Sequence, residues 1–403
     1  MNYIVYAIFL LIPFVNNVVV AGHIYLVDIP VLVGILFLPF SIKSRHQKIA
    51  ILDFLVFAYL VANLLSVAVG LETLYESARY YRQMVLGPVL LYIVVRFSPL
   101  SADQLRKAMF FMLPGILFQG FLLIKYYLIN HSRPVGVEAA ASTVTLSVLF
   151  CISLFVLFLG KQGRIGVAKR VLWLILITAF SAMLLVTFTR AAIISVALLL
   201  PCIHMIWIKR HLRKIFGSIV FASLLAFFVL LAAGSIISFS PQKVENQKEV
   251  QRSVGRLYEK DLYVKDLSDR LAFWGKLTRN ALENPLLGSG ASSYSIGKLG
   301  GTQFQLGSSH NLLVSSLLTS GLVGVCLMLL IIRSAFSSFN RFFANEDIDS
   351  LGKILMASFT VMLLVGITND FTGGRVLIWF LLLSLIAKIH VESQQMIKQA
   401  NGI

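Results

Sequence analysis

The sequence SHNLLVSSLLTSGLVGVCLMLLII, residues 309–332, decides the fold. After His310 it contains no acidic or basic side chain. It is longer than the run of about 20 mostly apolar residues that crosses the hydrocarbon core of a bilayer as an α-helix. We therefore predict a membrane-spanning helix here and look for similar runs on both sides of it.

Working outward from this stretch, we find twelve candidate membrane helices, at 2–20, 25–41, 49–70, 81–97, 107–129, 138–160, 169–187, 190–208, 215–239, 309–332, 352–369 and 374–391. The first 20 residues contain no Lys or Arg, so the basic start of a cleavable signal peptide is missing and we expect 2–20 to be the first membrane helix. The predicted fold class is an all-α polytopic membrane protein with about twelve transmembrane helices.

The composition agrees with a membrane protein, because 58% of the 403 residues are hydrophobic and only 13% are charged. About a quarter of the residues of a soluble domain are charged, which excludes a soluble enzyme and a disordered chain. The three cysteines lie inside apolar runs without pairing or metal-ligand spacing, so we expect small core residues and no disulfide scaffold. The net charge of +17 favours anionic lipid and an anionic substrate, and not nucleic acid, as partners.

The orientation follows from the basic residues of the short loops, which concentrate on the cytoplasmic side. With the N-terminus inside, the cytoplasmic connections are the basic segments 43–48, 101–107, 161–170, 209–214 and 333–353. An even number of helices then places both termini in the cytoplasm.

One segment, 240–308, is long enough to form a large loop on the outer side. From Leu271 to Leu282 its apolar residues recur at helical spacing, Asn284-Pro285 ends this amphipathic helix, and a glycine-rich turn follows over 286–301. We therefore divide the chain into nine helices over 1–239, the outer loop over 240–308, and three helices with a cytoplasmic tail over 309–403.

Arginines gather at the predicted outer edges of the helices: Arg79 and Arg82 before the fourth, Arg190 between two helices, Arg270 at the start of the loop helix and Arg375 at the start of the last. The planar guanidinium group suits phosphate oxygens, so several of them on one face fit a diphosphate at headgroup depth. The alternative for any single one is contact with lipid headgroups. Arg190 is flanked closely by apolar helices, which places it deeper.

His310 is a second candidate, because it stands where the outer loop meets the membrane. An imidazole titrates near neutral pH and is the usual general base. The alternative is a histidine that caps the helix or contacts the lipid interface.

Other chemical patterns are absent or weak. Asp347-Ile348-Asp349 has the spacing of a metal-binding D-x-D motif, but we interpret it as a solvated cytoplasmic loop. The run from Gly290 to Lys298 has the wrong spacing for a phosphate-binding loop. No motif of a metalloprotease or a serine hydrolase occurs, and we expect no metal and no cofactor.

Three further elements resemble one family. Thr187-Phe188-Thr189-Arg190-Ala191-Ala192 is similar to its T-x-S-R-x-A element, with Thr189 in place of Ser. Arg270, Trp274 and the run from Asn284 to Gly290 resemble its R-x-x-x-W…P-x-x-G-x-G element. His310-Asn311 with Gly321 and Gly324 resembles its H-N…G-x-x-G element. Together they cover about 185–330 and are similar to the O-antigen ligase and O-antigen polymerase family of bacterial surface-polysaccharide enzymes.

The resemblance implies a metal-independent, inverting glycosyltransferase of the GT-C type in the bacterial inner membrane, with its active site facing the periplasm. The donor would be a glycan on undecaprenyl diphosphate. By the family's pattern Arg190 and Arg270 would bind the diphosphate, and His310 would deprotonate or orient the acceptor hydroxyl. Our electrostatic argument adds possible helpers, namely Arg79, Arg82 and Arg375.

Two kinds of alternative stay open. For an O-antigen ligase of lipopolysaccharide biosynthesis the acceptor is the lipid A core, and the compact plan and the helical outer loop favour a ligase. For a polymerase the acceptor is a second lipid-linked glycan. A ligase of another surface glycan is also compatible. A transporter or flippase of lipid-linked oligosaccharides is the alternative of another class, but such proteins place polar residues near the membrane centre and show related halves, and neither feature is visible here.

Overall fold

The computed structural model describes part of the chain. The described residues are 1–14, 19–21, 24–42, 48–69, 78, 81–130, 284–288, 290, 296–299, 302–305, 312–342, 351–352, 355–356, 358–360, 362–363, 366 and 374–400. The predicted helices 138–160, 169–187, 190–208 and 215–239, and most of the loop 240–308, lie outside the described residues.

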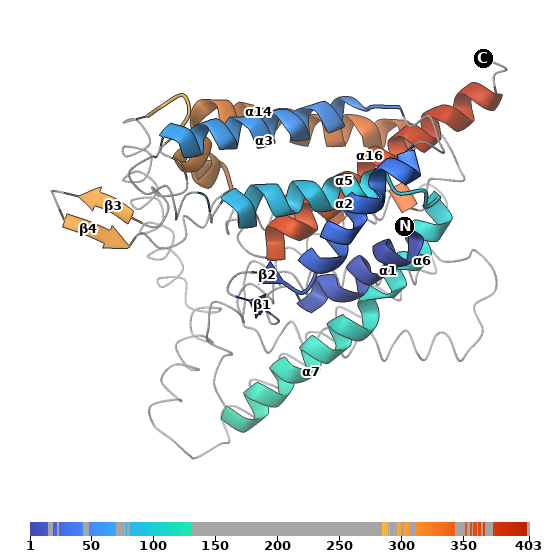
Figure 1. Cartoon of the computed structure of the whole chain (residues 1–403), viewed down its shortest axis with the longest axis horizontal. Coiled ribbons are helices and arrows are strands. Elements are labelled where there is room, and N and C mark those ends of the chain that lie inside the picture. Colours follow the sequence, from blue (N-terminus) through green and yellow to red (C-terminus); the bar gives the residue numbers. More distant parts are fainter. Residues whose placement is uncertain are drawn as a thin grey trace, which may run out of the picture.

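Helices make up most of the described part (Figure 1). They are α1 (Asn2–Leu11), α2 (Asp28–Ile42), α3 (Ile51–Val69), the π-helical turn η3 (Arg82–Leu86) that continues into α5 (Gly87–Arg96), α6 (Ala102–Phe110), α7 (Met112–Asn130), α14 (Leu312–Phe342) and α16 (Gly374–Ala400). Among the described residues, four segments are long and apolar enough to cross a membrane: Ile51–Val69, Ala102–Leu122, Leu312–Ser338 and Val376–Gln395. Two shorter apolar helices, Asn2–Phe14 and Asp28–Phe40, accompany them. This architecture is consistent with a helical polytopic membrane protein.

The start of the chain differs from the prediction of one helix over 2–20. Helix α1 ends at Leu11, and a 3-10 turn, η1 (Ile12–Phe14), follows. Strands β1 (Val19–Ala21) and β2 (Ile24–Tyr25) then pair in an antiparallel hairpin. Proline in this turn and β-branched valines in the first strand both disfavour a continuing helix.

A second hairpin begins in the segment predicted as a glycine-rich turn, 286–301, and continues beyond it. Strands β3 (Ile296–Leu299) and β4 (Thr302–Gln305) pair antiparallel, with Leu299 opposite Thr302. Two glycines separate these strands in the sequence, and such pairs favour tight hairpins. An all-α prediction missed both hairpins.

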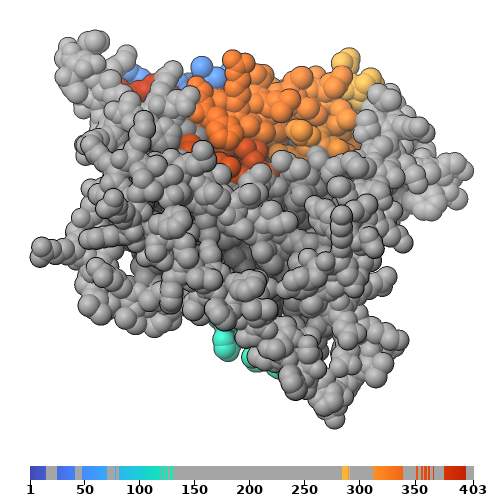
Figure 2. Space-filling view, turned by 180° about the vertical axis from the view of Figure 1, so that it is seen from behind, coloured from blue at the N-terminus to red at the C-terminus, as the bar shows by residue number. Residues whose placement is uncertain are grey.

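Helix α14 is also longer than expected. It continues to Phe342, so residues 333–342, predicted as part of a cytoplasmic connection, are helical. Its exposed side chains include the apolar Leu313, Leu322, Val323, Leu329, Leu330 and Phe336, and Figure 2 shows this helix at the surface. Such an exposed apolar face suits contact with lipid.

Helix α16 forms the centre of the described core. It packs against α5, α14 and α3, and its residues from Val376 to Ile389 are buried on all sides. Trp379 stacks on Phe359, with ring centroids 4.7 Å apart. A helix that is apolar all round is buried in the middle of a protein, and this is the position of α16.

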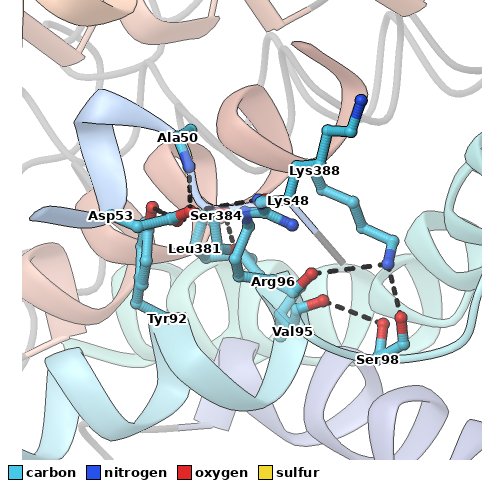
Figure 3. Close-up of polar contacts among 10 residues, drawn as sticks. All are labelled: Lys48, Ala50, Asp53, Tyr92, Val95, Arg96, Ser98, Leu381, Ser384 and Lys388. Atoms are coloured by element: carbon cyan, nitrogen blue, oxygen red, sulfur yellow. Dashed lines mark hydrogen bonds and ion pairs between the residues drawn. The ribbon is translucent and has the colours of Figure 1, made fainter. Parts of the chain in front are cut away.

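A buried polar cluster joins three segments at one end of the core (Figure 3). Arg96 at the end of α5 donates to both carboxylate oxygens of Asp53 in the first turn of α3, at 3.0 Å each. Tyr92 donates to Asp53 at 2.5 Å, and Lys388 of α16 donates to the carbonyl of Ser98 at 2.5 Å. We call these four side chains, Asp53, Tyr92, Arg96 and Lys388, the Asp53 cluster. It fixes α3, α5 and α16 against one another.

Candidate functional site

The most informative feature near the other end of α3 is a break in α14. Gly321 has φ 63° and ψ −160°, which no α-helix contains, so α14 consists of a short half, 312–320, and a long half, 322–342. The long half lies beside α3 in Figure 1. Only glycine enters this region of backbone space without strain.

The turn 284–290 inserts into this break. The amide of Leu322 donates to the carbonyl of Pro285 at 2.8 Å, and the amide of Val323 donates to the carbonyl of Leu286 at 3.2 Å. The turn itself is closed by the amide of Gly288, which donates to the carbonyl of Asn284 at 2.8 Å. The turn therefore supplies acceptors for the free amides at the start of the long half of α14.

Close backbone approach requires glycine at three positions. Gly288 has φ 71°, and a Cβ there would lie 2.7 Å from the backbone nitrogens of Ser320 and Gly321. A Cβ on Gly321 would overlap the carbonyl of Leu286. Gly290 has φ 70°, and a Cβ there would lie 3.0 Å from the carbonyl of Ser66. The turn, α14 and α3 thus meet backbone to backbone.

Polar side chains of α3 complete the junction. The Ser66 hydroxyl donates to the carbonyl of Thr319. The Ser320 hydroxyl donates to the side-chain carbonyl of Asn63 at 2.9 Å, and the Asn63 amide donates to the carbonyl of Tyr59 at 2.8 Å. Asn63, Ser66, Thr319 and Ser320 are all buried. We call the turn 284–290, Gly321 and these four residues the junction.

A comparison with known families identifies this region. Residues 174–329 match the model of the O-antigen ligase family. The chain carries a domain of the O-antigen ligase family. No curated protein matches the chain in a search of such proteins.

The O-antigen ligase domain contains two parts of the junction, the turn 284–290 and the break at Gly321. The remaining part, on α3, comes from earlier in the chain. The domain also contains Arg190, Arg270 and His310. The resemblance seen in motifs over 185–330 is therefore confirmed. The structure adds a physical reason for two of those motifs, because their glycines are the residues that let the turn and the broken helix touch.

The proposed site residues are only partly described. Arg190, Arg270, His310 and Arg79 lie outside the described residues. In the sequence, however, His310 stands directly before Asn311 and the start of α14, and the predicted loop helix that begins near Arg270 leads into the turn 284–290. The junction thus ties together the segments that follow these two residues.

Two of the possible helpers are placed. Arg82 is exposed in η3, within electrostatic reach of Asp28. Next to it, the hydroxyl of Tyr81 donates to the carbonyl of Leu60 on α3 at 3.3 Å, so η3 lies near the middle of α3. Arg375 belongs to the first turn of α16, and Lys388 lies near the middle of that helix. Arg82 shares its surroundings with an acidic side chain, which reduces its suitability as a phosphate ligand.

Sequence reasoning missed Asn63 and Ser66. Their signal in the sequence is a pair of polar residues three apart in the second half of an apolar helix, which puts both on one face. A polar pair on one face of a membrane helix marks contact with another helix and not with lipid. Hydropathy alone does not reveal which helix that is.

Proposed function

We propose that this protein is an inverting, metal-independent glycosyltransferase that moves a glycan from undecaprenyl diphosphate to the lipid A core at the periplasmic face of the inner membrane. The observation that carries the proposal is the O-antigen ligase domain over 174–329, which contains Arg190, Arg270 and His310 in the order of the family's motifs. The match to this family supports glycosyl transfer of the ligase type in general.

The proposed reaction is a single displacement at the anomeric carbon of the donor sugar. The acceptor hydroxyl oxygen forms the new bond, the bond from that carbon to the phosphate oxygen breaks, and undecaprenyl diphosphate leaves with the bonding electrons. Arg190 and Arg270 stabilise the negative charge that develops on the leaving diphosphate. His310 accepts the proton of the hydroxyl. The lipid diphosphate itself supplies the activated bond, so the reaction needs no nucleotide.

The arrangement of the described residues supports the proposed sidedness. At the end of α3 where Asp53 lies, Arg96 donates to the carbonyl of Lys48 and Lys388 donates to the carbonyl of Ser98. The amide of Ala102 donates to the carboxylate of Glu392. Their segments are those whose basic residues favour the cytoplasm. The turn 284–290 instead contacts α3 at Ser66, about 20 Å further along the helix at 1.5 Å per residue. A site built around this turn therefore belongs to the opposite face.

The direct test incubates the purified protein in detergent with a glycan on undecaprenyl diphosphate and with lipid A core, in the presence of EDTA. We expect a glycan linked to lipid A core, detected by mass spectrometry. Donor chains that grow on undecaprenyl diphosphate instead would identify a polymerase. With the protein in proteoliposomes instead of detergent, movement of the intact donor across the bilayer without any new glycosidic bond would identify a flippase and refute the enzyme.

The same assay tests the arginines. Lysine keeps the charge but loses the two-pronged geometry, so Arg190→Lys and Arg270→Lys are expected to lower kcat/KM at least about tenfold, or about 1.4 kcal/mol of transition-state stabilisation. Arg333→Lys, on the long half of α14, is the control and should keep wild-type activity. Full activity of both lysine variants would leave only a general electrostatic attraction.

A further inference from the structure

The break at Gly321 is built from exchanged hydrogen bonds. In an unbroken α-helix the amide of Val323 would donate to the carbonyl of Thr319, four residues earlier. Here that amide donates to Leu286, and the amide of Leu322 donates to Pro285. The carbonyl of Thr319 has therefore lost its helical donor.

Ser66 supplies the replacement. Its buried hydroxyl donates to the carbonyl of Thr319, and Asn63, one turn earlier on α3, holds the neighbouring Ser320 hydroxyl at 2.9 Å. An unsatisfied carbonyl in apolar surroundings is unfavourable, so the broken shape persists only while a donor from another helix is present. The two side chains of α3 thus hold the end of the short half of α14.

From this geometry we infer that Ser66 and Asn63 are positioning residues of the glycosyltransferase, which fix the direction of the half-helix 312–320 and so the place of His310, which precedes it by two residues in the sequence. The inference rests on the proposed function of His310. The short half is about 13 Å long, so a change of direction of about 20° at Gly321 moves its far end by about 4 Å. Displacements of about 1 Å are enough to slow a reaction about a hundredfold.

The Ser66 hydroxyl is expected to affect catalysis without affecting binding of the donor. The turn 284–290 is bonded to the long half of α14 through Leu322 and Val323, and it approaches Ser66 at the backbone carbonyl, which a change of the side-chain hydroxyl leaves in place. Loss of the Ser66 hydroxyl is therefore expected to loosen the short half while the turn keeps its hydrogen bonds. Catalysis by His310 should suffer more than donor binding by the arginines.

The test compares three variants in the transfer assay, per folded molecule. Ser66→Ala is expected to lower kcat about ten- to a hundredfold with the KM for the lipid-linked donor unchanged within about twofold. Ser66→Thr keeps the hydroxyl and should restore most of kcat. Ser384→Ala is the matched control, because Ser384 is equally buried but donates only to Leu381 of its own helix, at 2.6 Å.

Hydrogen exchange gives a readout that does not need activity. Peptides covering 312–323 should exchange faster in Ser66→Ala than in the wild type or in Ser384→Ala. Wild-type kcat in Ser66→Ala, or a lowered kcat without faster exchange, would overturn the inference. If the wild type itself transfers no glycan, the proposed function fails and with it the role of His310, whereas the exchange experiment still decides whether Ser66 holds the short half.

Discussion

At positions 288 and 321 the backbone geometry requires the residue to be glycine. Both have φ near +70°, and each approaches the backbone of the other's segment too closely for a Cβ atom. For any other residue the left-handed region alone is unfavourable by about 1–2 kcal/mol. These two positions therefore depend on the absence of a side chain, whatever chemistry the site performs.

The first prediction concerns Gly288→Ala. We expect it to lower the free energy of unfolding by at least about 1–2 kcal/mol, because the new Cβ meets the backbone of α14 in a strained conformation. The thermal unfolding midpoint of the detergent-purified protein measures the effect. Leu286→Ala in the same turn is the control, since its side chain is 65% exposed, and it should unfold like the wild type. A Gly288→Ala midpoint equal to that of the control would contradict the described junction.

The second prediction tests the role of His310. As a general base it contributes about 10²–10⁴-fold, so His310→Ala should lower turnover by that factor while donor binding is kept by the arginines. The wild-type rate should rise with pH over the range in which imidazole loses its proton, because the neutral form is the acceptor. A histidine that only caps the helix predicts lower folded yield and near-normal turnover per folded molecule, and then His310→Asn would also be active. Transfer per folded protein for the Ala and Asn variants separates the two roles.

At the scale of elements, α3 organises the described part from both of its ends. Its first turn holds the ion pair with Arg96, and its second half holds the break in α14. The rest of its surface carries large exposed apolar side chains such as Phe54 and Phe57. One helix thus combines a lipid-facing surface with two polar contacts that fix its partners.

The third prediction concerns the ion pair. Asp53 and Arg96 are 8% and 2% exposed, so Asp53→Ala leaves a buried guanidinium without its partner and should destabilise the fold by about 3–5 kcal/mol. The double variant Asp53→Ala with Arg96→Met removes both charges and should recover much of that loss. Asp103→Ala is the control, because Asp103 forms ion pairs at the exposed surface of α6. Equal unfolding midpoints for the single and double variants would refute the expected role of the unpaired charge.

The sequence predicted the long apolar elements well. The runs 49–70, 81–97 and 374–391 correspond to α3, η3 with α5, and most of α16, because the length of an apolar run sets the length of a buried or membrane helix. The run 2–20 failed because hydropathy does not distinguish a valine-rich strand from a helix. Gly321 was noticed only as part of a motif, and its positive φ depends on Pro285 and Leu286, which are distant in the sequence.

The candidate site was predictable as a set of residue types and not as a geometry. Arginines and a histidine at helix ends were visible from charge and topology. The contact between Ser66 and Thr319 joins positions 253 apart, and no local pattern connects them. Pairing of helices is determined by side chains that meet only after folding.

For the whole molecule, the fourth prediction concerns the orientation in the membrane. In a chain without its native cysteines, a cysteine at position 253 should react with a membrane-impermeant reagent added to intact spheroplasts, because the loop 240–308 is predicted to face the periplasm. A cysteine at position 44, in the basic connection 43–48, should react only after the membrane is opened. The reverse pattern would invert the topology and separate the proposed site from a periplasmic donor.

The central place of α16 has a consequence for biosynthesis. The ribosome makes this helix after every other described helix, although α5, α3 and α14 all pack against it. Until residues 374–400 have entered the membrane, the surfaces of those helices that will face α16 are exposed to lipid or to the insertion machinery. The earlier helices therefore stay inserted but incompletely packed, and the described core forms only after residues 374–400 have been translated.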